Sequence, residues 1–101
     1  MSVLMTLRVQ GDPTQLEHIR DVEPDAFKKV ATVGKQMGAT YHRFYATDDE
    51  ILVIDEWPSE EAFHTFFASQ PDIPKFMAEA GVTTEPTITF YRKLDLGDDI
   101  G

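Results

Sequence analysis

The sequence contains no cysteine, which excludes disulfide bonds, thiol nucleophiles and thiolate metal ligands in this chain. No apolar run approaches the roughly 18 residues needed to cross a bilayer, and no basic segment followed by an apolar one opens the chain. We therefore expect a cytoplasmic protein without membrane contact. Basic residues are also few, because 9 Lys and Arg oppose 18 Asp and Glu, for a net charge of −9. Such a charge repels phosphate, so we expect no nucleic-acid partner.

The apolar content of the chain is sufficient for one folded domain. The chain has 101 residues, of which 42% are hydrophobic, and single domains commonly hold roughly 100–150 residues. Folding at this length buries only somewhat over about 60% of the surface, so burial against a second copy is expected to supplement a thin core. We expect residues 1–94 to form the domain and residues 95–101 to form an acidic, flexible tail.

Hydrophobic periodicity predicts four strands separated by helical connections. The alternation from Val3 to Val9 is typical of a strand with one buried face, and three later runs are rich in β-branched and aromatic residues. The predicted strands are residues 3–9, 40–46, 51–57 and 86–93. The helical connections are residues 13–37 and 59–81, each interrupted by proline.

The predicted order β-α-β-β-α-β is that of a ferredoxin-like α+β domain. Such a domain has a four-stranded antiparallel sheet of order 4-1-3-2, with its helices on one face. The candidates for the second face are Val3, Met5 and Leu7 or else Leu4, together with Ile51–Ile54, Ile88 and Phe90. Because a monomer rarely leaves a large apolar face exposed, we expect two copies to pair their sheets as a dimeric α/β barrel.

The turn at residues 47–50 decides which residue lies opposite Asp55. A two- or four-residue loop places His42 there, on the face that carries Phe44 and Trp57. A three- or five-residue loop places Arg43 there instead, as a structural ion pair. A carboxylate fixes the tautomer of an imidazole and raises its basicity, so we predict His42 and Asp55 as a catalytic pair. The alternative is a pair that only satisfies two half-buried polar groups.

Aromatic residues near this pair are candidates for substrate binding. We predict Trp57, Phe44, Phe63 and Phe67 in this role because flat rings stack on an aromatic ligand, although the same residues also suit a core. The other histidines, at positions 18 and 64, are expected to face solvent from helices. We expect neither a metal nor a cofactor, because no two histidines have the spacing of metal ligands and no phosphate-binding loop is present.

The run from Asp55 to Phe63 (DEWPSEEAF) resembles the acidic-x-Trp-x-Ser-x-Glu-Ala-Phe signature of the antibiotic-biosynthesis-monooxygenase-like superfamily. The likeness extends to Ser69 and to the strand from Pro86 to Leu94, so it covers nearly the whole chain. It is strongest to small actinobacterial members. The superfamily is similar in fold but mixed in activity, with cofactor-independent monooxygenases, haem-degrading enzymes, isomerases and members of no known activity. The resemblance therefore implies the fold more specifically than the reaction.

Individual positions narrow what the resemblance implies. Trp57 matches a tryptophan that lines the pocket of haem-degrading members, whereas Phe66 stands where many monooxygenase-like members have histidine. The chain has no asparagine for the first strand and no haem-ligating histidine near Phe76. The resemblance thus favours a cofactor-independent monooxygenase or isomerase of a small aromatic or quinone-like molecule over haem cleavage. Two alternatives are a non-catalytic ligand-binding protein and a structural dimer, the latter without a cavity for a ligand.

Overall fold

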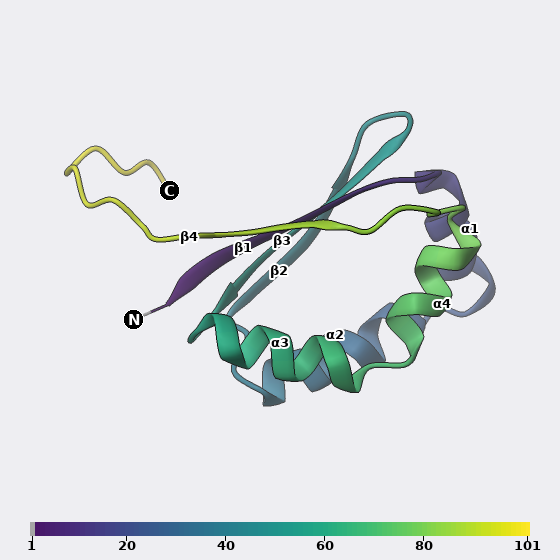
Figure 1. The fold of residues 1–101 in the computed structure, drawn as a ribbon, viewed down its shortest axis with the longest axis horizontal. Coiled ribbons are helices and arrows are strands. Elements are labelled where there is room, and N and C mark those ends of the chain that lie inside the picture. Colours follow the sequence, from purple (N-terminus) through teal and green to yellow (C-terminus); the bar gives the residue numbers. More distant parts are fainter. Residues whose placement is uncertain (1) are drawn as a thin grey trace.

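The computed structural model describes residues 2–101, which form one four-stranded antiparallel sheet with four helices against one of its faces (Figure 1). The strands are β1 (Val3–Gln10), β2 (Tyr41–Ala46), β3 (Glu50–Trp57) and β4 (Thr87–Tyr91). The helices are α1 (Pro13–Val22), α2 (Ala26–Gln36), α3 (Glu60–Ser69) and α4 (Asp72–Glu79). The sheet order is β2-β3-β1-β4, which confirms the predicted ferredoxin-like arrangement.

The first helical connection is two helices, as the proline at position 24 predicts. Helix α1 begins after Asp12, whose side chain caps it by accepting a hydrogen bond of 3.0 Å from the amide of Thr14. Pro24 lies between α1 and α2. Helix α2 ends just before Gly38, which adopts a φ of +113° that glycine tolerates best.

The second connection is divided in the same way. Helix α3 begins after Ser59, whose hydroxyl accepts a hydrogen bond of 3.1 Å from the amide of Ala62. Pro71 precedes α4, and Pro74 lies in the first turn of α4, where a missing N–H breaks no helical hydrogen bond. The prolines therefore set where each helix starts.

The hairpin of β2 and β3 has the even-length loop. Ala46 pairs with Ile51 and His42 pairs with Asp55, whereas Arg43 lies opposite Ile54. The first of the two predicted registers is confirmed. Since side chains alternate between the faces of a sheet, this register turns His42 toward the helices and Arg43 away from them.

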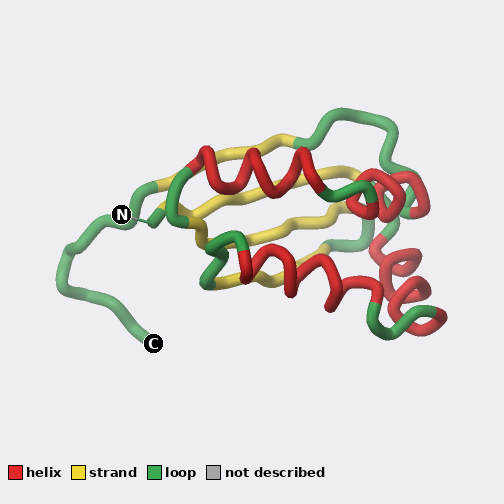
Figure 2. The backbone as a smooth tube through the Cα atoms, turned by 90° about the horizontal axis from the view of Figure 1, so that it is seen from below, coloured by secondary structure: helices red, strands yellow, loops and turns green. Residues whose placement is uncertain are grey.

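All the helices lie across the same side of the sheet, as Figure 2 shows. The core between the two layers is formed by β1, β3 and α3, and its largest fully buried side chains are Trp57, Phe63 and Met5. Ile88 and Phe90 were expected on the other face. They instead lie beside Leu7 and Met5 and pack against the core, because the antiparallel register with β1 puts them in phase with its buried residues.

The sheet face turned away from the helices, termed the open face, carries both apolar and charged groups. By register its apolar and aromatic members are Leu4, Leu52, Ile54, Tyr41, Tyr45 and Tyr91. Arg8 and Glu50 form an ion pair of 3.6 Å on the same face. No other part of the described chain covers this face (Figure 1).

The chain after β4 has no regular secondary structure and extends away from the sheet (Figure 1). Lys93 and Asp99 form an ion pair of 2.5 Å within this segment, while Leu96 and Ile100 are exposed. Its flexibility stays a prediction. Within residues 2–101, none of the helices combines the length and apolar character needed to cross a membrane.

Candidate functional site

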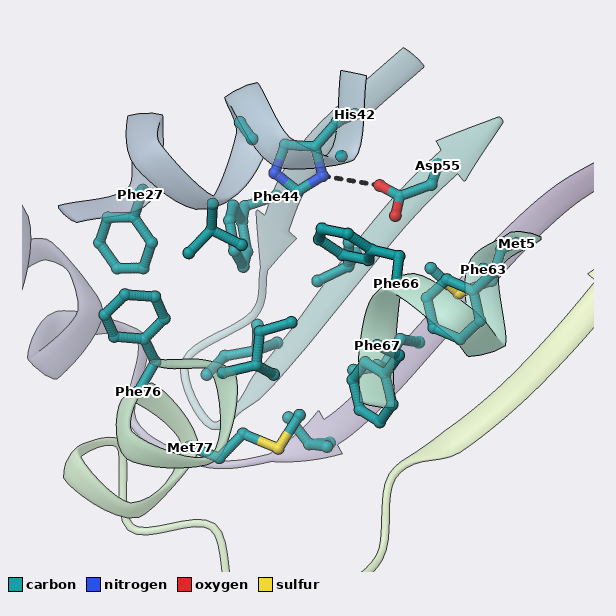
Figure 3. Close-up of a pocket in the computed structure, with 18 of the residues that line it drawn as sticks. Met5, Phe27, His42, Phe44, Asp55, Phe63, Phe66, Phe67, Phe76 and Met77 are labelled. Carbon is teal, nitrogen blue, oxygen red and sulfur yellow. Dashed lines mark hydrogen bonds and ion pairs between the residues drawn. The ribbon is translucent and has the colours of Figure 1, made fainter. Parts of the chain in front are cut away.

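A cavity of about 110 Å³ lies between the sheet and the helices. Its walls come from β1, β2 and β3 on one side and from all four helices on the other (Figure 3). The side chains that the strands and helices direct into the cavity are almost all apolar. A fully filled interior, expected for a purely structural dimer, is not what the structure has.

Among the described residues, His42 and Asp55 are the only ones with ionisable side chains that line this cavity. Nδ1 of His42 lies 2.6 Å from Oδ1 of Asp55 (Figure 3). The indole Nε1–H of Trp57 donates to Oδ2 of the same carboxylate at 3.1 Å. The side chain of Asp55 is 7% exposed. A buried carboxylate must be hydrogen-bonded, and here each oxygen has its own donor.

This hydrogen-bond pattern sets the tautomer of His42. An ionised Asp55 only accepts hydrogen bonds, so Nδ1 carries the hydrogen and donates it to the carboxylate. The lone pair then lies on Nε2, which points away from Asp55 (Figure 3). A neutral imidazole held this way can accept a proton at Nε2, and the adjacent carboxylate stabilises the imidazolium that forms.

The cavity reaches solvent between β2 and α2. The side chain of His42 is 38% exposed and Phe44 is 45% exposed, although both line the cavity. Ala31 of α2 is another wall residue that is exposed. These residues mark the mouth, so a ligand in the cavity would have its outer end beside His42.

Aromatic rings form much of the remaining wall. Trp57 and Phe66 have ring centroids 5.0 Å apart, deep in the cavity. The ring centroid of Phe27 in α2 lies 5.7 Å from that of Phe44 in β2 and 4.6 Å from that of Phe76 in α4. These contacts connect β2 to both helices. Edge-on and tilted aromatic packing of this kind makes a close-packed, apolar wall.

All the predicted site residues line this one cavity. They are His42, Asp55, Trp57, Phe44, Phe63 and Phe67. Their roles in catalysis and binding stay predictions. His18 and His64 are exposed on helices outside the cavity, as expected. Among residues 2–101, no three His, Asp or Glu side chains converge as metal ligands would.

The sequence-based prediction did not include Phe27, Phe76, Met5 or Gly34, which also line the cavity. Phe27 and Phe76 do fall on the apolar faces of their helices, and this periodicity was a usable signal. Periodicity does not say that two helices distant in the sequence meet over the same strand. Phe66 is a wall residue as well and adds only apolar surface.

The fold is similar to that of solved structures named as antibiotic biosynthesis monooxygenases. The similarity is one of fold, because these structures are all under 25% identical to this chain in sequence. No protein-family model matches the sequence, and no curated protein matches it significantly.

Three solved structures illustrate the similarity. SnoaB from Streptomyces nogalater, described as a cofactor-independent oxygenase, is 17% identical with a TM-score of 0.62, covering 96% of this chain and 98% of its own. An antibiotic biosynthesis monooxygenase is 12% identical with a TM-score of 0.61, covering 92% and 99%. A conserved protein from Methanosarcina mazei is 16% identical with a TM-score of 0.67, covering 93% and 94%.

Proposed function

We propose that the protein removes a proton from a small aromatic or quinone-like molecule bound in the cavity, and that the resulting anion is isomerised or oxygenated without a cofactor. The observation that carries this proposal is the 2.6 Å hydrogen bond between His42 and Asp55 on the wall of an otherwise apolar cavity. In the proposal Nε2 of His42 is the base, and Asp55 orients it and stabilises the imidazolium.

The surrounding aromatic residues have a supporting role in the proposal. Trp57, Phe44, Phe63 and Phe67 line the same cavity and would contact the faces and edges of a ligand ring. Their apolar surface would also keep water from the anion after the proton has left. Isomerisation would follow if His42 returned the proton to a different atom of the ligand.

Oxygenation would use dioxygen as co-reactant and the substrate anion as electron donor. For a hydroxyarene, the O–H proton passes to Nε2 of His42, and the anion gives one electron to dioxygen. The phenoxyl radical and superoxide then join in a carbon–oxygen bond at a ring carbon, and the imidazolium returns its proton to the terminal oxygen. Loss of water from this hydroperoxide leaves a quinone, so one oxygen atom enters the product and one enters water. The similarity in fold to SnoaB, described as a cofactor-independent oxygenase, supports this branch.

We further propose that the working form is a homodimer joined through the open face. On that face Leu4, Leu52 and Ile54 are only half-buried and Tyr45 and Tyr91 are exposed, and no other part of the described chain covers it. Apolar area of this kind is normally buried against a partner.

The test of the proposed reaction is turnover of 3-methoxyphenol under ¹⁸O₂. The expected product is a quinone with one ¹⁸O atom, and His42→Ala is expected to lower the rate by roughly a hundredfold or more. His18→Ala is the matched control, because His18 is an exposed histidine outside the cavity. Equal rates for the wild type and His42→Ala, with both proteins folded by circular dichroism, would falsify the role of His42.

The alternative is a protein that binds a ligand without changing it. It is favoured by the small number of polar groups, since in the described part of the chain one histidine–aspartate pair provides all the ionisable side chains of the cavity. Binding of the phenol to wild-type protein with no product, under either air or ¹⁸O₂, would establish this alternative.

A further inference from the structure

We propose that the cavity takes a neutral molecule with a single ring and one hydroxyl group, and that the hydroxyl hydrogen-bonds to His42 at the mouth. This inference deepens the proposed function and rests on it in one respect, because it uses the same free nitrogen of His42. It concerns binding, so it can be tested without turnover.

The size of the cavity sets the limit of one ring. Its volume is about 110 Å³, whereas an engineered apolar cavity of about 150 Å³ in another protein binds benzene. A single six-membered ring therefore fits with little space to spare. The further rings of a fused two- or three-ring system would have to lie outside the mouth in solvent, or the helices would have to move away from the sheet.

The charges around the cavity require a neutral ligand. Within residues 2–101, no Lys or Arg side chain lines the cavity, and the one carboxylate there, Asp55, already accepts hydrogen bonds at both oxygens. The chain as a whole carries a net charge of −9. A ligand carboxylate would lose its hydration without gaining a counter-charge, and a ligand cation could reach Asp55 only by displacing His42 or Trp57.

The hydrogen-bonding pattern selects a hydroxyl. Nε2 of His42 is an acceptor because Nδ1 donates to Asp55, and the Nε1–H of Trp57 is already used by the same carboxylate. The side chains of the cavity thus provide one free acceptor, Nε2 of His42 at the mouth, and the deeper part of the cavity is apolar. A phenol matches this pattern with its ring inside and its O–H directed outward to His42.

Gly34 provides an independent way to change the size of the cavity. It is a buried residue of α2 that lines the cavity, and a Cβ there would lie 3.5 Å from the ring of Phe66 and 3.7 Å from that of Trp57. These are ordinary contact distances, so Gly34→Ala narrows the cavity without a clash, and alanine also favours a helix. Lost binding in this variant would not result from lost folding.

The experiment is ¹⁹F NMR titration with four probes at neutral pH: 4-fluorophenol, fluorobenzene, 4-fluorobenzoate and 4-fluoro-1-naphthol. We expect 4-fluorophenol to bind about three- to tenfold more tightly than fluorobenzene, the effect of one hydrogen bond. We expect 4-fluorobenzoate not to bind and the naphthol to bind more weakly than the phenol. His42→Ala should lower the affinity for 4-fluorophenol to that for fluorobenzene and leave fluorobenzene unchanged.

The variants separate size from hydrogen bonding. Gly34→Ala should lower the affinity for 4-fluorophenol and the affinity for fluorobenzene by the same factor. Thr32→Ala, a change at an exposed position of the same helix, should alter neither affinity. Tighter binding of the benzoate or the naphthol than of the phenol overturns the inference, as does failure of every one-ring probe to bind.

Failure of the inference is distinguishable from failure of the proposed function. If 4-fluorophenol binds as described but no phenol is converted, the ligand class stands and the reaction is wrong. If a polycyclic phenol is converted in a His42-dependent way while the one-ring probes do not bind, the reaction stands and the ligand class is wrong.

Discussion

Among single residues, Asp55 determines the chemistry of the site because it is buried and accepts hydrogen bonds from two different donors. His42 donates to one of its oxygens and Trp57 to the other. The indole of Trp57 can only donate, whereas His42 can donate or accept at Nδ1 depending on its tautomer. Any side chain that replaces Asp55 must therefore place an acceptor next to the indole N–H of Trp57.

Asp55→Asn is expected to reverse the tautomer of His42. The amide must turn its oxygen to Trp57, because an NH₂ group there would meet another donor, so the NH₂ group faces Nδ1 of His42. Nδ1 then accepts, and the hydrogen moves to Nε2. Two-bond ¹H–¹⁵N spectra of the histidine ring should show Nδ1–H in the wild type and Nε2–H in the variant, with loss of any His42-dependent turnover.

A double variant checks this reasoning. In Asp55→Asn with Trp57→Phe the amide is free to turn its oxygen to His42, so the Nδ1–H tautomer should return in part. An unchanged tautomer in Asp55→Asn would show that Trp57 does not control the orientation of the side chain at position 55.

The identity of these residues could be predicted from the sequence, but only in part. From the sequence, either His42 or Arg43 could lie opposite Asp55, depending on whether the loop between the two strands has an even or an odd number of residues. The donor from Trp57 to Asp55 could not be predicted, because residues two apart on a strand share a face but need not be in contact.

At the scale of secondary-structure elements, the end of α2 depends on Gly38. This residue has a φ of +113°, and a Cβ there would lie 2.7 Å from Cγ of Pro58. Gly81 after α4 also has a positive φ, of +76°, but a Cβ there would meet no atom within 4 Å. Comparing alanine substitutions at the two positions therefore distinguishes the cost of backbone strain, which both share, from the cost of the steric contact, which only Gly38 has.

Gly38→Ala is expected to lower the free energy of unfolding by about 2–3 kcal/mol, and Gly81→Ala by only about 1 kcal/mol. Both variants have the cost of a positive φ, and Gly38→Ala adds the clash with Pro58. Urea denaturation measures both values. Equal losses in the two variants would mean that the contact with Pro58 relaxes at no cost.

The start of α1 is expected to depend on pH. Hydrogen bonds from the hydroxyl and then the amide of Thr14 lower the pKa of Asp12 below its ordinary value. Since the pKa is lowered in the folded state, this stabilisation is present above the unfolded pKa of about 4 and is lost as the pH falls through the folded pKa. Asp12→Asn can still accept at the cap but does not titrate.

The measurement is urea denaturation of the wild type and Asp12→Asn from about pH 6 down to about pH 3. The free energy of unfolding of the wild type should fall relative to that of Asp12→Asn toward the acidic end. A constant difference over this range would show that the cap of α1 does not depend on the charge of Asp12.

For the whole molecule, the open face is expected to hold two copies together. Ile54→Arg places a charge at the centre of this face and should weaken the dimer by roughly a hundredfold or more, because each copy would bury an unpaired guanidinium. Val22→Arg is the control, since Val22 is exposed on α1 and belongs to the helical layer. Light scattering should give the dimer mass for the wild type and Val22→Arg, and the monomer mass for Ile54→Arg.

A monomeric wild type would contradict the dimer directly. A dimeric Ile54→Arg protein would contradict the open face as the interface. The extended segment after β4, where Leu96 and Ile100 are exposed, would then be the next candidate for the interface.

The sequence by itself determined the local features of this protein. Strand alternation, prolines and capping residues such as Asp12 and Ser59 depend on neighbours in the chain, so the order of elements and the ferredoxin-like class followed from them. Only the tertiary structure decided that Phe27 and Phe76 meet beside Phe44, that Ile88 and Phe90 face the helices, and that a cavity remains at the His42–Asp55 pair. The physical reason is that a cavity is space left between layers, and its size depends on how distant side chains pack together.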